Sequence, residues 1–347
     1  MDTTSLFVTI AALAYVGFMI YLANQEASRP GSGVGLRWMQ YGVISGMVFV
    51  GLNVVAIAFL GGAPAPDAEP LAQISAVAAL VNMIVVGLAA VLSGAVIVSP
   101  AARLALRRVL ERNAAYDPDS PVHTTALILS LAFVGLNTTQ FVLSGGLNGL
   151  AESIESSGVA LDQVAFTGLL WVLAALLGVG LGLRRTAAQV AQRLGLRIPT
   201  REDLRQGLAV GIGLYAGSLV MALIWAALVS PETFAEQTAA SQQLGSAINS
   251  LPLVLVVSLS AAIGEEIFFR GALQPIFGLV PTSLFFALIH TQYTLTPASV
   301  WIIVVALVFG WLRRRTSTTA AVIAHFVYNF IPLLLVYTLS DQLTGLF

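Results

Sequence analysis

Residues 251–270 read LPLVLVVSLSAAIGEEIFFR, an apolar run of membrane-spanning length that ends in Glu265, Glu266 and Arg270. On insertion scales a charged residue near the centre of a membrane helix costs about 2.5–3.5 kcal/mol, so the three together cost roughly 8–10 kcal/mol if they lie deep. The packing of a helix bundle does not require such charges. We therefore expect this stretch to carry a functional site as well as a membrane span.

The composition of the whole chain predicts an all-α, polytopic transmembrane helix bundle. Of its 347 residues, 57% are hydrophobic and only 10% are charged, whereas soluble domains average about 25% charged residues. The net charge of −1 argues against nucleic acid as a partner. The chain has no cysteine, which excludes disulfides, thiolate nucleophiles and cysteine metal ligands. Its basic residues are all arginine, which excludes lysine-dependent catalysis.

Apolar runs of about 18 residues or more indicate about ten spans, one of them broken or re-entrant. The first run has no arginine before it, since Arg29 is the first, so we interpret it as a retained transmembrane helix rather than a cleaved signal peptide. The expected spans are 5–23, 39–61, 73–97, 124–145, 164–183, 206–229, 251–269, 271–290, 297–312 and 318–340.

The distribution of charge between the spans predicts their orientation. Arginine-rich loops follow the first, third, fifth and ninth spans, and the alternate loops carry acidic residues instead. Because positively charged loops remain in the cytoplasm, we expect an even number of spans with both termini outside. The run Arg313–Arg315 is interpreted as such a topology signal and nothing more.

A long basic segment, 184–205, divides the chain into an N-terminal membrane region of unknown role, residues 1–200, and a core, residues 201–347. Thr200, followed three residues later by an acidic residue, is a helix-start signal at this boundary. Within the N-terminal region the five residues Phe49–Asn53 recur as Phe133–Asn137. A duplicated helix pair and a chance identity between two apolar helices explain this repeat equally well.

The two adjacent glutamates are expected to have different roles. Glu266 and Arg270 are four residues apart, so in a helix they share a face and form an ion pair. Glu265 points about 100° away and has no partner near it in the sequence. An unpaired carboxylate in a site of low dielectric is suited to act as a general base.

Two of the chain's three histidines lie in apolar segments close to this pair. In the last span, His325 and Asn329 are four residues apart and line one face. His290 ends the eighth run, and a straight helix would place it about 30 Å from Arg270. Gly278 and Pro281 favour a break in that helix, which would bring His290 back to the glutamates.

The three patterns Glu265-Glu266-x-x-x-Arg270, Phe286-x-x-x-His290 and His325-x-x-x-Asn329 occur in that order on successive apolar segments. Together they resemble the CAAX-protease and bacteriocin-processing family of intramembrane endopeptidases, which is related to the Ras-converting CAAX prenyl endopeptidase. The resemblance covers roughly residues 205–345 and leaves the first five spans unmatched. It implies an integral membrane protease, which we expect in a prokaryotic plasma membrane.

The resemblance also implies a role for each residue. Glu265 and His290 would activate the attacking water, His325 and Asn329 would stabilise the oxyanion, and Glu266 with Arg270 would support the site. The substrate would be a membrane-associated protein or peptide, including prenylated CAAX-type C-termini, in contact with the lipid bilayer. We favour a mechanism without a cofactor because the His-Glu-x-x-His zinc pattern is absent. The alternative is a zinc ion held by Glu265, His290 and His325.

Two other functions fit the same residues. Buried glutamate and histidine on broken helices are also found in proton-coupled transporters, which would show gradient-dependent flux and no cleavage product. A non-catalytic immunity or binding protein built on the same helices is a further alternative. The complete set of costly charged motifs argues against that last possibility.

Overall fold

A computed structural model describes residues 3–60, 74–112, 114–293 and 297–344 of the chain. Within these ranges the regular secondary structure is helical, apart from one isolated bridge between Leu181 and Arg185. The predicted all-α membrane bundle is thereby confirmed.

Nine helices in the described ranges are long and apolar enough to cross a membrane. They are α1 (Thr3–Ser28), α2 (Val34–Leu60), α3 (Ala76–Val98), α5 (Pro121–Leu143), α7 (Leu161–Gly178), α9 (Arg201–Leu228), the continuous helix formed by α11 (Leu251–Glu265), η1 (Glu266–Leu273) and α12 (Gln274–Phe277), α14 (Pro297–Arg315) and α15 (Thr318–Thr344). The shorter helices are α4 (Pro100–Val109), α6 (Gly146–Ser157), α8 (Ala187–Leu194), α10 (Pro231–Ala247), α13 (Leu279–Ile289) and η2 (Thr291–Tyr293).

The expected eighth span, 271–290, is not a single helix. Its first residues continue the seventh span to Phe277, and Gly278 then takes a φ of 93°, a conformation that favours glycine. The chain turns there into α13, which is apolar but only 11 residues long. The predicted break is thus confirmed, whereas the predicted end of the seventh span at residue 269 was too early.

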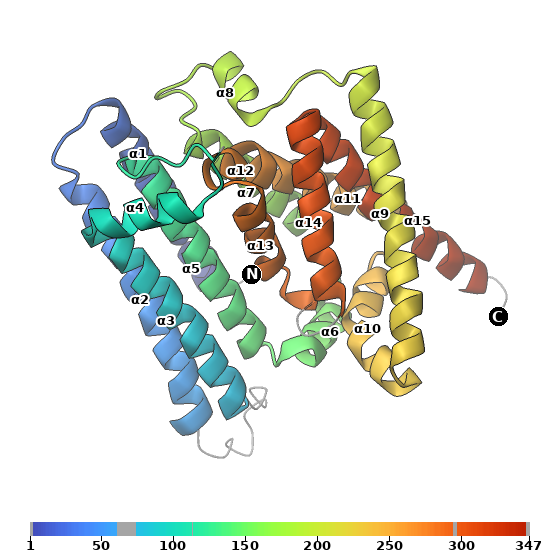
Figure 1. The fold of residues 1–347 in the computed structure, drawn as a ribbon. Coiled ribbons are helices and arrows are strands. Elements are labelled where there is room, and N and C mark those ends of the chain that lie inside the picture. The colour runs from blue at the N-terminus through green and yellow to red at the C-terminus, as the bar shows by residue number, and fades with distance from the viewer. Residues whose placement is uncertain (1–2, 61–73, 113, 294–296, 345–347) are drawn as a thin grey trace.

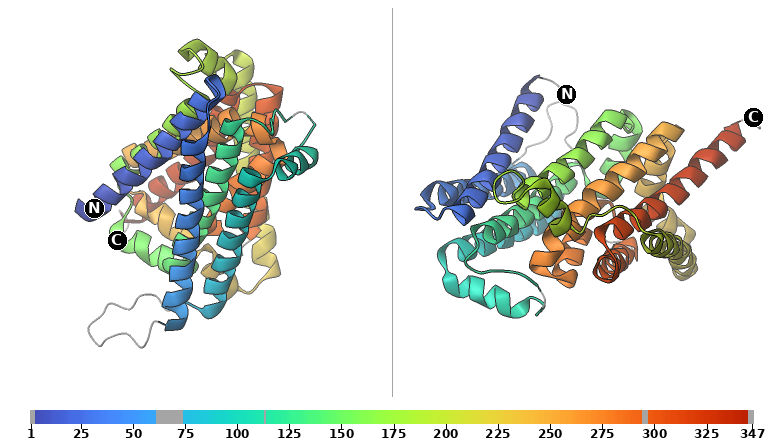
Figure 2. Two further views of the ribbon diagram at one scale, coloured as in Figure 1. Left: turned by 90° about the vertical axis from the view of Figure 1, so that its left-hand side faces the viewer. Right: turned by 90° about the horizontal axis from the view of Figure 1, so that it is seen from above.

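The helices form a bundle in which the N-terminal members lie on one side and α9, α14 and α15 on the other (Figures 1 and 2). The helices α7, α11 and α13 lie between these two groups. The short helices α4 and α8 are found at one end of the bundle, and α6 and α10 at the opposite end (Figure 1). The largest buried apolar cluster joins η1, α12, α13, α14 and α15 and includes Phe269, Phe286 and Phe309.

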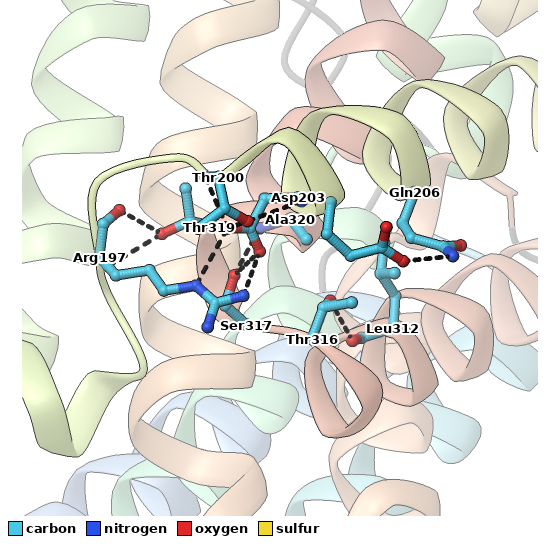
Figure 3. A network of polar contacts seen from close by, with 10 residues as sticks. Arg197, Thr200, Asp203, Gln206, Leu312, Thr316, Ser317, Thr319 and Ala320 are labelled. Atoms are coloured by element: carbon cyan, nitrogen blue, oxygen red, sulfur yellow. Dashed lines mark hydrogen bonds and ion pairs between the residues drawn. The ribbon is translucent and has the colours of Figure 1, made fainter.

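A polar network fixes the beginning of α15 to the segment between α8 and α9 (Figure 3). Thr200 caps α9 as expected, and its capping partner Asp203 is fully buried. Arg197 pairs with that carboxylate at 2.8 Å, and the hydroxyl of Ser317 donates to it at 2.6 Å. Thr319 donates to the carbonyl of Arg197 at 3.0 Å. We call the network of Arg197, Thr200, Asp203, Ser317 and Thr319 the latch. It sets the position of α15, the helix that carries His325.

Some helices from before the predicted boundary at residue 200 contact helices that follow it. Both α7 and α8 lie before it and pack against α11 or η1. The division into two domains, and the duplication of a helix pair, therefore remain predictions. In the repeated segments, Asn53 and Asn137 each donate to the carbonyl four residues earlier in their own helix, at 2.7 and 2.9 Å.

Candidate active site

The candidate site is built on η1, a π-helix in which each N–H bonds the carbonyl five residues earlier. The N–H of Gln274 is the last to follow this pattern. The next residue, Pro275, has no N–H, so the carbonyl of Arg270 is left for another donor. Arg313 supplies it, since its Nε donates to that carbonyl at 3.1 Å.

A second arginine completes the carbonyl bonding of this helix. Arg193 of α8 donates from Nη1 to Gly271 O at 2.9 Å and from Nη2 to Ala272 O at 3.4 Å. An ordinary α-helix was expected here, and the interpretation of Arg313 as a topology signal and nothing more was wrong, because its side chain bonds this helix. Pro275 inside an apolar helical run was the signal that could have revealed the irregular turn.

The fully buried carboxylate of Glu266 is shared by two partners. Arg270 Nη1 lies 3.2 Å from its Oε1, which confirms the predicted pair. His325 Nδ1 lies 2.9 Å from the same oxygen, a contact between η1 and α15 that was not predicted. One carboxylate thus compensates the buried guanidinium and also fixes the orientation of the imidazole.

Aromatic rings surround these polar groups. The guanidinium of Arg270 lies over the ring of Phe286, 4.4 Å from its centroid, and His290 stacks on the same ring at 4.3 Å. Phe309 stacks on His325 at 5.0 Å. Phe286, the first residue of the second motif, therefore packs between the arginine and a candidate catalytic histidine. Cation–π contact in such a water-poor site helps to stabilise the buried charge.

Glu265 and His290 face each other, as the broken helix predicted. Their nearest atoms, Oε2 and Nε2, are 3.7 Å apart, and both side chains remain slightly exposed. His290 Nδ1 lies 2.6 Å from the carbonyl of Phe286. Because a carbonyl only accepts, Nδ1 carries the hydrogen, and Nε2 of a neutral ring then presents a lone pair to Glu265. Glu265 Oε2 is buried without a hydrogen-bond partner among the described residues.

His325 and Asn329 lie on one face of α15, and Asn329 is partly exposed. The bond from His325 Nδ1 to Glu266 constrains the expected oxyanion role. If Nδ1 donates its hydrogen to the carboxylate, Nε2 becomes a donor only when the ring is an imidazolium. Asn329 is a donor in any protonation state. The structure brings all six predicted site residues to one region, although their catalytic roles remain predictions.

A cavity of about 340 Å³ lies between α7 and α11, and Glu265 forms part of its wall. The two helices approach each other closely beside the cavity. A Cβ atom on Gly264 would lie 2.9 Å from the carbonyl oxygen of Gly168, so only glycine fits at this contact. Trp171 and Ser260 also line the cavity. A helix of the unmatched N-terminal region therefore contributes to the surroundings of the candidate base.

The zinc alternative can be tested against this geometry. Among the residues that the structure describes, no three histidine or acidic side chains lie close enough together to hold a metal ion. His325 directs Nδ1 to Glu266, which already pairs with Arg270. The set Glu265, His290 and His325 does not fit a zinc centre in this arrangement, and we derive no step through a metal.

Residues 247–331 match the family model described as type II CAAX prenyl endopeptidase Rce1-like. The matched segment runs from the last residue of α10 into α15 and contains all six candidate site residues. The resemblance noted in the sequence is confirmed for this segment, about a quarter of the chain. No curated protein and no solved structure matches the chain.

Proposed function

Because its C-terminal core matches the Rce1-like family, we propose that this integral membrane protein is an intramembrane endopeptidase that hydrolyses membrane-associated substrates with a water activated by Glu265 and His290. The proposal rests on the arrangement of Glu265 and His290. A carboxylate oxygen without a hydrogen-bond partner faces the free nitrogen of a histidine at 3.7 Å. Two acceptors so placed suit one water molecule that donates a hydrogen to each.

In the proposed reaction Glu265 removes one proton from this water, while His290 Nε2 accepts a hydrogen bond from the second hydrogen, which stays on the water oxygen. The water oxygen attacks the scissile carbonyl carbon, and the carbonyl oxygen becomes an oxyanion. As the carbon–nitrogen bond breaks, Glu265 returns the proton to the leaving amine. The products are a carboxylic acid and an amine, so one water is consumed in each cycle. Positioned acid–base catalysis of this kind contributes about 10²–10⁴-fold.

The oxyanion would be stabilised by Asn329 and by His325 as an imidazolium. Glu266 supports that charged form because its carboxylate accepts from His325 Nδ1 at 2.9 Å. Donors fixed before the reaction stabilise developing charge more effectively than mobile water does. Glu266 and Arg270 would thus act by positioning His325 rather than by touching the substrate.

The position of the site supports a membrane-associated substrate. Glu265 is near the middle of the α11–α12 helix, a candidate membrane span, and borders a cavity lined by apolar and polar side chains of α7 and α11. We propose that substrates are membrane-associated, with prenylated CAAX-type C-termini as the first class to test. We also propose that the end of the bundle that carries α8 faces the cytoplasm of a prokaryotic cell and that both termini lie outside. The start of α13 and the end of α14 both contact Glu111, so the short α13 would return the chain as the tenth segment and keep the number of crossings even.

The test is cleavage of prenylated, unprenylated and transmembrane peptides by the purified protein in detergent, followed by mass spectrometry. Glu265→Gln should remove product formation and leave the melting temperature unchanged. Glu232→Gln, which changes an exposed carboxylate on α10, is the matched control and should cleave normally. We expect EDTA and 1,10-phenanthroline to have no effect.

Two outcomes would contradict this proposal. Inhibition by chelators, reversed by added zinc, would require a metal mechanism and a rearranged site. Absence of product from every peptide, combined with proton-driven flux that depends on Glu265, would identify a transporter instead.

A further inference from the structure

A basic pocket lies at the end of the bundle where α7 leads into α8. Its volume is about 510 Å³, and its lining contains no acidic side chain. It is lined by Arg184, Arg185, Gln189, Gln192 and Arg193. Three positive charges and two amides around one cavity favour an anion.

Three acidic side chains near this end of the bundle are paired with other arginines. In the part of the chain that the structure describes, the ion pairs outside the candidate site are Arg197–Asp203, Arg205–Glu202 and Arg314–Glu111. None of the three pocket arginines has a carboxylate within 4.0 Å in that part of the chain. Half-buried charges without a counter-ion are unfavourable, so binding of an anion in this pocket would stabilise the three arginines.

Neutral acceptors satisfy only some of the available donors. Arg184 Nε donates to Asn24 Oδ1 at 2.7 Å, and Arg185 Nη1 donates to the carbonyl of Val179. Arg193 uses two donors on the carbonyls of η1. A guanidinium has five N–H donors in a fixed fork, so several remain for a ligand with multiple oxygens.

The arginines also disfavour one another. Burial lowers the pKa of Arg193 to about 10, and the positive charge of Arg185 adds to the effect. Burial likewise lowers the pKa of Arg184, again with a contribution from Arg185. With this pKa Arg193 remains charged at neutral pH, and a bound anion would offset the repulsion between it and Arg185.

The position of the pocket identifies the source of the anion. Arg184 and Arg185 follow within eight residues of the end of α7, a candidate membrane span. Leu183 beside them is 44% exposed. Basic groups next to an exposed apolar side chain at the end of a span lie where lipid headgroups are found. We infer that this pocket binds the phosphate group of an anionic membrane lipid.

This lipid site would share a residue with the support of the candidate active site, because Arg193 lines the pocket and also bonds Gly271 O and Ala272 O of η1. The inference does not depend on the proposed protease activity. Its test therefore measures lipid binding, which would be unaffected if the protein were not a protease.

The experiment is native mass spectrometry of the delipidated full-length protein titrated with dioleoylphosphatidylglycerol or dioleoylphosphatidylcholine. We expect preferential retention of the anionic lipid by the wild type. The double variant Arg184→Gln/Arg185→Gln should bind it about 30-fold more weakly, since each basic residue near a charged surface contributes roughly fivefold. Arg184→Lys/Arg185→Lys should keep most of the binding, which separates loss of charge from misfolding.

The matched control is Arg107→Gln/Arg108→Gln, which removes the same charge from α4 at the same end of the bundle. Its lipid retention should equal that of the wild type. Equal retention of both lipids by the wild type, or an equal loss in the α4 control, would overturn the site. Displacement of the anionic lipid by 1 mM inorganic phosphate would overturn the lipid assignment in favour of a soluble phosphate ligand.

Discussion

The N-terminal helices and the C-terminal core both bury polar side chains, but of different kinds. Between α2, α3 and α5 the buried partners are neutral: Thr139 donates to Asn82 at 2.9 Å, and Gln40 donates to Thr125 at 3.0 Å. In the core the buried partners are charged: Glu266 forms an ion pair with Arg270 and a close contact with His325 Nδ1.

Under the proposed function, the neutral groups hold helices together and the charged groups support the reaction. Neutral pairs between membrane helices contribute about 0.6 kcal/mol on average and cost little to insert. Burial of an ion pair costs several kcal/mol for each ion, and attraction between the partners returns this only when the geometry is very good. Helix packing alone does not justify the charged cluster, and four predictions test the contrast.

The largest effect is expected from Glu266→Ala, which leaves Arg270 buried and unpaired. Removal of one partner of a buried ion pair destabilises a protein by about 3–5 kcal/mol. We expect a lower melting temperature in detergent together with loss of peptide cleavage. The double variant Glu266→Gln/Arg270→Met should recover most of the melting temperature but no activity. A double variant that cleaves normally would show that the ion pair is only structural.

Asn329→Ala should affect the reaction and leave the fold unchanged. Loss of one oxyanion donor typically lowers kcat by about 10²–10³-fold, or roughly 2.7–4 kcal/mol of transition-state stabilisation. The measurement is kcat on the best peptide of the panel. Asn137→Ala is the matched control, because that amide bonds only a carbonyl of its own helix in α5. Similar losses in both variants would show that the effect is not specific to the site.

Much of this site could be predicted because its partners lie one turn apart. Glu266 and Arg270 still share a face in a π-helix, so the predicted pair survives the change of helix type. The break before α13 was also predictable, since Gly278 and Pro281 signal it locally. These features depend on neighbours in the sequence, and a single chain is enough to reveal them.

The features that were missed depend on residues far apart in the sequence. The π-helix is stabilised by Arg193 and Arg313, which reach it from α8 and α14. The bond between His325 and Glu266 exists because the latch and the packing of α9 place α15 beside η1. No local pattern encodes such contacts, so an ordinary helix was expected and the contact between His325 and Glu266 was not predicted.

A substitution in the latch at Ser317, which lies between the candidate spans α14 and α15, should have a smaller effect on stability. Ser317→Ala removes the 2.6 Å hydrogen bond to the buried carboxylate of Asp203 and also the bond that the same hydroxyl accepts from the N–H of Ala320 at 3.1 Å. A hydrogen bond to a charged group contributes about 1.5–3 kcal/mol, and we expect a corresponding decrease in the free energy of unfolding. Thr316→Ala is the control, because that hydroxyl bonds only the carbonyl of Leu312 (Figure 3). Equal losses of stability in the two variants would show that the bond between Ser317 and Asp203 contributes no more than a bond within one helical turn.

The smallest effect should come from the neutral pair Asn82 and Thr139 in the N-terminal bundle. A double-mutant cycle with Asn82→Ala and Thr139→Val should give a coupling energy of about 0.6 kcal/mol, and peptide cleavage should not change. The same cycle on Glu266 and Arg270 should give a coupling several times larger, because each single substitution leaves an uncompensated polar group in the core. If the neutral pair shows equal coupling, or if its loss slows cleavage, polar burial in the two regions serves the same purpose, and the charged cluster ceases to identify the site.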